Sequence, residues 1–124
     1  MEEEQYRILI VDDTPNNLKV LVPLFLEDGR YKVNVAQNGQ EALDSVEKAQ
    51  PDLILLDVMM PVMDGHEACR HLKENSETSH IPIIFLTAKT EVEDVTEGFN
   101  LGAADYVAKP FNTLELMARV ETHL

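Results

Sequence analysis

The stretch PDLILLDVMMPVMDG, residues 51–65, decides the fold of this chain. Its apolar run, Leu53–Leu56, is short enough for a strand buried on both faces, and turn-forming residues stand on either side of it. The run places one carboxylate, Asp57, at the carboxyl end of that strand. An aspartate at such a position often only ends a strand or caps the next helix, so the other strand ends must decide whether its role is structural or functional.

Composition and charge limit what the chain can be. Its 124 residues, 44% of them hydrophobic, suit one compact domain over residues 1–124, with residues 1–6 as a flexible N-terminus. The formal net charge of -13 disfavours direct contact with nucleic acid or with an anionic membrane. The acidic start MEEEQYR is unlike a signal peptide, Cys69 is the only cysteine, and no apolar run approaches the roughly 20 residues of a membrane span. We therefore expect a soluble cytoplasmic protein.

Apolar runs alternate with helical patterns along the whole chain. Strict alternation of strands and helices implies parallel pairing, right-handed crossovers and helices on both faces of one sheet. The expected fold class is a doubly wound α/β domain with one five-stranded parallel sheet. The expected strands are 8–11, 32–36, 53–56, 81–86 and 105–108, and the expected helices follow the capping residues Thr14, Asn38, Asp64, Thr90 and Asn112.

Two of the helical patterns contain a residue that should disturb them. Pro23 lies inside the first helix, where it cannot donate a backbone hydrogen bond, and we expect a kink rather than a break because the apolar face continues across it. Gly98 lies inside the fourth helix and should weaken it by about 1 kcal/mol relative to alanine. The fourth helix is therefore expected to be the least stable, with Val92, Val95 and Phe99 on its core side.

The ends of the expected strands carry polar residues. In doubly wound sheets, ligands bind outside the carboxyl ends of the strands, and here those ends hold Asp12, Asp13, Asp57, Thr87 and Lys109. Each is ordinary alone, but together they place carboxylates, a hydroxyl and an ammonium on one rim. Crowded carboxylates favour protonation or a hard divalent cation, for which Mg2+ is the natural candidate. Asp57 could then attack a phosphoryl group and form an aspartyl phosphate, with Thr87 and Lys109 facing the phosphoryl oxygens.

At this point the residues match a family. The chain resembles the receiver domain of two-component response regulators over nearly its whole length, from ILIVDD through LILLDVMMPVMDG and IIFLTA to ADYVAKPF. The resemblance implies a flavodoxin-like sheet with strand order 2-1-3-4-5 and phosphorylation of Asp57. It also implies that Asp13, Asp57 and the backbone carbonyl of Met59 ligate Mg2+, and that Asp12 helps through water or orientation.

The same resemblance implies roles for residues from the last two strands. Thr87 and Lys109 would hold the phosphoryl group, Lys109–Pro110 would be a cis peptide bond, and Tyr106 would be the aromatic switch residue. A histidine kinase or phosphotransfer domain would donate the phosphoryl group. An effector domain, a partner protein or a second copy of this chain would then dock on the face formed by the fourth helix, the last strand and the fifth helix. Such a domain is not an enzyme, although it promotes its own phosphotransfer and slow autodephosphorylation.

Other function classes on this fold remain open. A Mg-dependent phosphohydrolase with an aspartyl nucleophile would share the nucleophile and the sheet. Phosphatases of the haloacid dehalogenase type, however, typically carry a second aspartate two residues after the first, where this chain has Met59. The complete set of acidic, hydroxyl and lysine residues argues against a non-phosphorylated interaction module. A flavin-binding protein would need a phosphate-cradling loop, and no such sequence is evident.

The chain contains four histidines, His66, His71, His80 and His123. No two of them are spaced as a pair on one helix face, so a zinc site is not predicted. We expect all four at surface positions.

Overall fold

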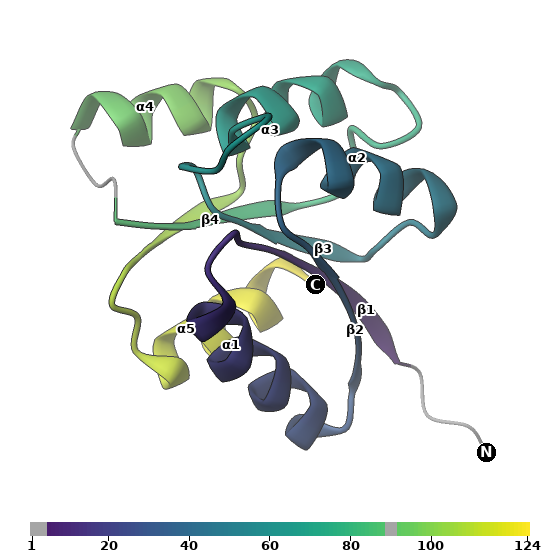
Figure 1. The fold of residues 1–124 in the computed structure, drawn as a ribbon, viewed down its shortest axis with the longest axis vertical. Coiled ribbons are helices and arrows are strands. Elements are labelled where there is room, and N and C mark those ends of the chain that lie inside the picture. Colours follow the sequence, from purple (N-terminus) through teal and green to yellow (C-terminus); the bar gives the residue numbers. More distant parts are fainter. Residues whose placement is uncertain (1–4, 89–91) are drawn as a thin grey trace.

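The computed structural model describes residues 5–88 and 92–124. In this part of the chain, five parallel strands form one sheet in the order β2-β1-β3-β4-β5, and five helices alternate with them. Helices α2, α3 and α4 lie on one face of the sheet, and α1 and α5 lie on the other (Figure 1). The predicted doubly wound α/β fold and its strand order are therefore confirmed. The strands are β1 Tyr6–Val11, β2 Tyr31–Ala36, β3 Leu53–Leu56, β4 Ile83–Thr87 and β5 Asp105–Ala108; the helices are α1 Pro15–Asp28, α2 Gly39–Lys48, α3 Gly65–Glu74, α4 Val92–Asn100 and α5 Thr113–His123.

Three strands begin at other residues than the sequence indicated; β2 begins one residue early, at Tyr31, and β1 and β4 differ by two residues. β1 already begins at Tyr6, inside the segment expected to be flexible, because Tyr6 pairs with Tyr31 of β2. β4 begins at Ile83 rather than Ile81, just after Pro82, which has no amide hydrogen to donate to a neighbouring strand. Residues 1–4 lie outside the described part, so the flexibility expected there stays a prediction.

The sheet separates two hydrophobic clusters among the described residues. β3 lies at the centre of the sheet, and each of its four residues is at most 1% exposed. Burial on both faces explains why its sequence is a continuous apolar run instead of an alternating one. Asp57 therefore follows the most enclosed strand of the fold. The helices cover the sheet through Ala42, Val46, Ala68, Cys69 and Leu72 on one face, and through Leu21, Phe25, Leu116 and Val120 on the other.

Helix α1 continues through Pro23 and ends at Asp28. The proline does not break the helix, as predicted, and the kink expected at this position stays a prediction. Gly29 ends the helix in the left-handed conformation, with φ 84°, and its amide donates to the carbonyl of Leu26.

Helix α4 differs from its prediction at Phe99, while its expected capping residue, Thr90, lies outside the described residues and the weakening by Gly98 stays a prediction. Phe99, expected on the core side, is 46% exposed. Gly98 is buried, and a Cβ atom at this position would lie 2.5 Å from Cε2 of Tyr106. The glycine thus provides the space in which Tyr106 packs against α4, a role that its low helix propensity alone does not reveal.

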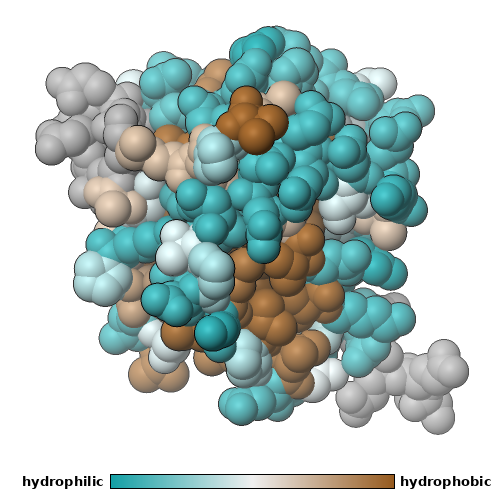
Figure 2. Space-filling view, viewed as in Figure 1, coloured by the Kyte–Doolittle hydropathy of each residue, from teal (hydrophilic) through white to brown (hydrophobic). Residues whose placement is uncertain are grey.

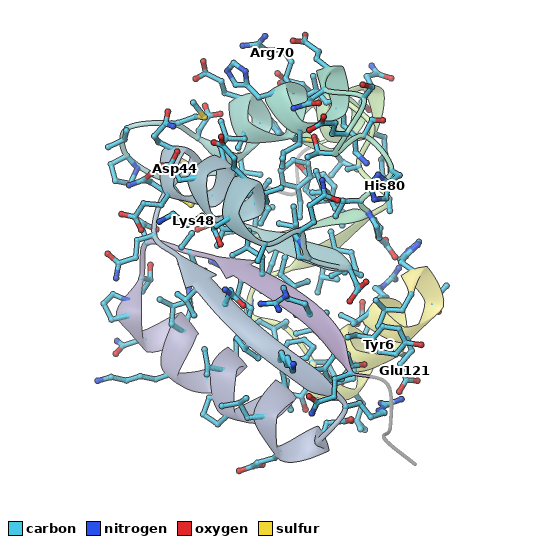
Figure 3. The ribbon with its side chains drawn as sticks, turned by 90° about the vertical axis from the view of Figure 1, so that its right-hand side faces the viewer. Tyr6, Asp44, Lys48, Arg70, His80 and Glu121 are labelled. Atoms are coloured by element: carbon cyan, nitrogen blue, oxygen red, sulfur yellow. The ribbon has the colours of Figure 1, made fainter. Side chains whose placement is uncertain are left out.

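The outer surfaces of the helices are largely polar. Figure 3 shows Asp44 and Lys48 on α2 and Arg70 on α3, at the outside of the molecule. In Figure 2, hydrophobic residues gather mainly in the lower half of the view, the half that holds α1 and α5 in Figure 1. Across residues 5–88 and 92–124, no helix combines the length and the apolar character needed to cross a membrane.

Asp105, the first residue of β5, forms a charged cluster with the last turns of α5. Its carboxylate accepts hydrogen bonds from Nη1 of Arg119, with N···O distances of 3.0 and 2.9 Å, and from the amide of Tyr106 at 2.8 Å. Nε2 of His123 lies 3.1 Å from the same carboxylate. Burial raises the pKa of Asp105, but the hydrogen bonds from Tyr106, Arg119 and His123 outweigh burial and hold the pKa below its ordinary value.

We expect Asp105→Asn to lower the free energy of unfolding by about 1 kcal/mol at neutral pH. Because the pKa is lower in the folded state than in the unfolded chain, the carboxylate stabilises the fold above the unfolded-state pKa, about 3.9. This contribution is lost as the pH falls through the folded-state pKa. Urea denaturation of both proteins at neutral and strongly acidic pH measures the difference, with Asp44→Asn, an exposed carboxylate on α2, as control. An equal loss of stability at both pH values would contradict the prediction.

Candidate functional site

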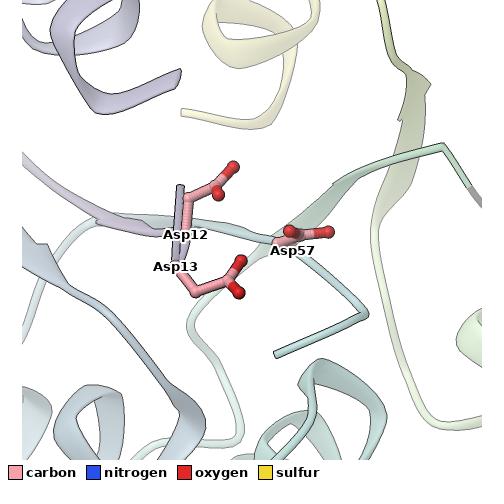
Figure 4. Close-up of side chains that lie close together, drawn as sticks. All are labelled: Asp12, Asp13 and Asp57. Atoms are coloured by element: carbon pink, nitrogen blue, oxygen red, sulfur yellow. The ribbon is translucent and has the colours of Figure 1, made fainter. Parts of the chain in front are cut away.

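Three carboxylates meet at the carboxyl ends of β1 and β3, those of Asp12, Asp13 and Asp57 (Figure 4). The register pairs Val11 of β1 with Leu56 of β3, so the two strands end at the same level. The amide of Asp57 also donates to the carbonyl of Val11, at 2.9 Å. Each of the three side chains offers one oxygen that lies within 4.8 Å of the other two. The structure therefore brings together the acidic residues that the sequence placed on one rim.

Lys109 reaches the same rim from the segment that follows β5. Its Nζ lies 2.7 Å from Oδ2 of Asp12 and 3.2 Å from Oδ2 of Asp57. Its backbone amide donates to the carbonyl of Thr87 at 2.9 Å, which joins the ends of β4 and β5. The peptide bond between Lys109 and Pro110 is cis, as the family resemblance implies. One ammonium is thus shared by two carboxylates.

The charges at this rim do not balance. Burial is the largest influence on Asp57 and raises its pKa; the ammonium of Lys109 opposes this effect and the carboxylate of Asp12 adds to it, so the pKa stays above its ordinary value. Burial lowers the pKa of Lys109, but the hydrogen bond with Asp12 and the charge of Asp57 outweigh it and raise the pKa. A divalent cation would neutralise the carboxylate charge that one ammonium leaves uncompensated.

Asp12 is held by several donors at once. Its Oδ1 accepts from the amide of Thr14 at 2.9 Å, and its Oδ2 accepts from Nδ2 of Asn17 at 3.1 Å as well as from Lys109. The side chain is only 2% exposed. Sequence reasoning missed Asn17, although a polar side chain in the first turn of the helix after Asp12 was a usable signal. Thr14 occupies the predicted N-cap position of α1, but its side chain makes no capping hydrogen bond.

The other predicted site residues lie around this group. Thr87 is the last residue of β4 and is 1% exposed, whereas Met59, in the loop after Asp57, is 60% exposed. A cleft of about 770 Å³ opens between that loop, α3 and α4, and Asp13 forms part of its wall. Tyr106 does not join the carboxylates, because its ring packs against Phe85 of β4, with 5.2 Å between the ring centroids.

His66 is placed differently from its prediction. It was expected at the surface, yet its side chain is only 13% exposed, and its Nε2 lies 3.2 Å from the hydroxyl oxygen of Tyr106. Nothing in the spacing of the histidines indicates this contact, because it joins α3 to β5 across 40 residues of sequence.

The sequence of this chain matches the model of a known protein family over most of its length. The family model described as the response regulator receiver domain matches residues 8–121, a range that includes every residue of the rim described above. The chain belongs to this family. Its role as a receiver domain of two-component signalling, which the sequence indicated, is therefore confirmed.

Similar proteins combine the receiver domain with further segments. This chain is 45% identical over 123 residues to a Vibrio cholerae protein named "Probable cyclic di-GMP phosphodiesterase", and the match covers 97% of this chain and 27% of that protein. It is 43% identical over 124 residues to the DNA-binding response regulator MtrA of Mycolicibacterium smegmatis, covering 100% of this chain and 53% of that protein. The receiver domain thus spans between about a quarter and about half of the length of these relatives.

A solved structure also resembles this chain. It is the receiver domain of the sensor histidine kinase PA1611 from Pseudomonas aeruginosa, with a TM-score of 0.87 and 34% identity, covering 95% of this chain and 96% of that chain. That structure has a magnesium ion coordinated in the active site cleft.

Proposed function

We propose that this receiver domain is a switch driven by phosphorylation of Asp57, with a histidine kinase or a phosphotransfer domain as donor. The observation that carries the proposal is the position of Asp57 between an acidic pair and the ammonium of Lys109, 3.2 Å away. A carboxylate can act as a nucleophile toward phosphorus when nearby positive charge stabilises the transferred oxygens. Asp57, at the end of the buried strand β3, has the ammonium of Lys109 beside it to supply this positive charge.

The donor set of the rim fits Mg2+. All the candidate ligand atoms are oxygens, which this hard cation prefers, and the magnesium in the PA1611 receiver domain supports the assignment. We assign the ligand positions to Asp13, Asp57 and the carbonyl of Met59. Asp12 would act through water or orientation, because Thr14, Asn17 and Lys109 already contact its oxygens. The cation would neutralise the carboxylate charge that Lys109 leaves uncompensated and would stabilise oxygens of the incoming phosphoryl group.

The remaining residues would convert phosphorylation into a change of surface. Lys109 would turn from the carboxylate of Asp57 to a phosphoryl oxygen, and the hydroxyl of Thr87 would move toward the same group. The space vacated by Thr87 would favour an inward position of Tyr106, which changes the face formed by α4, β5 and α5. An effector domain, a partner protein or a second copy of the chain would dock there, and the net charge of -13 favours a protein partner over nucleic acid.

Two further points belong to the same proposal. The domain would not be an enzyme acting on a separate substrate, because it would be the phosphoryl acceptor itself and would lose the group by slow autodephosphorylation. It would work in the cytoplasm, where the kinases of two-component systems present their phosphoryl groups.

Incubation with Mg2+ and acetyl phosphate, followed by intact mass spectrometry, tests the proposal. We expect one phosphoryl adduct per chain and no adduct when a chelator removes the cation. Rapid multiple turnover of a phosphate ester without an accumulating adduct would instead favour the aspartyl phosphohydrolase. Absence of both results would reject phosphoryl chemistry at this rim.

Asp13→Asn is expected to weaken Mg2+ binding by about tenfold or more, because it removes a charged oxygen ligand. An amide NMR titration of the unphosphorylated domain measures the affinity. Asp64→Asn is the matched control, since Asp64 lies in the wall of the same cleft and its substitution makes the same chemical change. Equal affinities in the wild type and Asp13→Asn would reject the ligand assignment.

A further inference from the structure

His66, in the first turn of α3, contacts two other elements through its two ring nitrogens. Nε2 lies 3.2 Å from the hydroxyl oxygen of Tyr106 in β5, and Nδ1 lies 3.6 Å from Oε2 of Glu97 in α4. The imidazole also stands edge-on to the ring of Phe85 in β4, with the centroids 5.2 Å apart and an angle of 88° between the planes. One side chain of α3 therefore touches three elements that follow it in sequence.

The carboxylate of Glu97 influences which ring nitrogen carries the proton. A negative charge beside Nδ1 favours an N–H at that position, which leaves Nε2 as an acceptor for the hydroxyl of Tyr106. The 3.6 Å separation is too long for a hydrogen bond, so Glu97 acts through its charge and Tyr106 is the direct partner. In that tautomer, the imidazole accepts a hydrogen bond from the tyrosine.

Tyr106 occupies a close-fitting position beside this imidazole. Its ring packs against Phe85 and Phe99, with centroids 5.2 and 6.0 Å away, and against Gly98, where a Cβ atom would lie 2.5 Å from the ring. If the ring turned outward, it would lose these contacts and its hydrogen bond with His66 together. The hydrogen bond therefore stabilises the inward position over any position in which the hydroxyl leaves the imidazole.

We propose that His66 is a positioning residue for Tyr106, and that it holds the ring inward before any phosphoryl group is present. The inference rests on the proposed function, in which the inward ring belongs to the signalling conformation. His66 then raises the population of that conformation in the unphosphorylated domain. One hydrogen bond of ordinary strength changes the equilibrium constant between the inward and outward positions of the ring by about fivefold. By linkage, it changes the affinity for a phosphoryl group at Asp57 by no more than the same factor.

The first test follows the ring of Tyr106 without phosphorylation, by fluorine NMR of the domain labelled with 3-fluorotyrosine. His66→Leu fills similar space but accepts no hydrogen bond, so the resonance of Tyr106 should shift toward the value of an exposed ring. His66→Gln keeps an acceptor and should restore much of the wild-type position. His71→Leu, at an exposed position five residues later in α3, should leave the resonance unchanged. An unchanged resonance in His66→Leu would overturn the proposal.

The second test measures the affinity for beryllofluoride, a phosphoryl mimic, in the presence of Mg2+. His66→Leu should lower this affinity by up to about fivefold, and it should have no further effect in a Tyr106→Phe background. An equal loss in that background would show that His66 acts through packing alone and would overturn the proposal.

The two tests separate this proposal from the proposed function. If the wild type binds no beryllofluoride, the phosphorylation switch fails, while the fluorine resonance still decides whether His66 positions Tyr106. If the wild type binds the mimic and His66→Leu changes neither measurement, the role of His66 alone is rejected.

Discussion

Asp57→Asn is expected to abolish the phosphoryl adduct that the wild type forms with acetyl phosphate and Mg2+. The amide side chain has nearly the shape of the carboxylate, but it lacks the charge that makes the oxygen a nucleophile. It also removes one of the three carboxylates that gather at the rim. Intact mass spectrometry should therefore find the unmodified chain after the longest incubation that labels the wild type.

The loss of labelling should not come from unfolding. Because the pKa of Asp57 lies above its ordinary value, the folded state disfavours the ionised carboxylate relative to the unfolded chain. A neutral amide removes that penalty at neutral pH, so without Mg2+ the variant should be at least as stable as the wild type. Asp64→Asn is the control for labelling, since asparagine caps α3 as well as aspartate does. An adduct in Asp57→Asn that maps to Asp13 or Asp12 would refute Asp57 as the acceptor.

Gly65→Ala should produce the largest loss of stability among single methyl additions in this chain. A Cβ atom at Gly65 would lie 2.0 Å from the carbonyl oxygen of Asp57 and 2.9 Å from Cα of Val58. These are backbone atoms, so no side chain can turn away to make room. We expect a decrease in the free energy of unfolding of about 3 kcal/mol, measured by urea denaturation. Labelling should also fall, because the displaced backbone carries the nucleophile.

Gly29→Ala is the matched comparison. Gly29 has a left-handed backbone, with φ 84°, but no atom would lie within 4 Å of an added Cβ. Its replacement should therefore cost only about 1 kcal/mol, from conformation alone, and should leave labelling intact. If Gly65→Ala proves as stable as Gly29→Ala, the close approach of α3 to the Asp57 backbone does not constrain the fold.

Local chemistry explains why most of the fold could be predicted. Asn38, Asp64 and Asn112, three of the predicted capping residues, each accept a hydrogen bond from the amide of the residue three positions later. The apolar run Leu53–Leu56 likewise identified a strand buried on both faces. Such signals lie within a few residues of one another, so a single sequence contains them in full. The acidic residues of the rim followed from the same strands, because parallel strands end on one edge.

The missed features depend on approaches between segments that lie apart in the sequence. Gly98 reads as a helix weakener, and only the packing of Tyr106 against it reveals its use. His66 carries no motif, since its partners lie in α4 and β5. Phe99 follows the apolar spacing of its helix, yet it is 46% exposed, and the neighbouring Gly98 makes the close contact with Tyr106 of the sheet. Helical periodicity shows which residues share a face, but not how closely that face approaches its neighbours.

The start of α3 also matters for anyone who builds chimeric receivers. Three consecutive residues have separate structural roles there: Asp64 caps the helix, Gly65 lies against the backbone of Asp57, and His66 contacts Tyr106. A transplant of α4, β5 and α5 alone onto another receiver would therefore leave half of this contact behind. A chimera that preserves the contact between His66 and Tyr106 must also carry residues 64–66, which belong to the start of α3 and not to the transplanted elements.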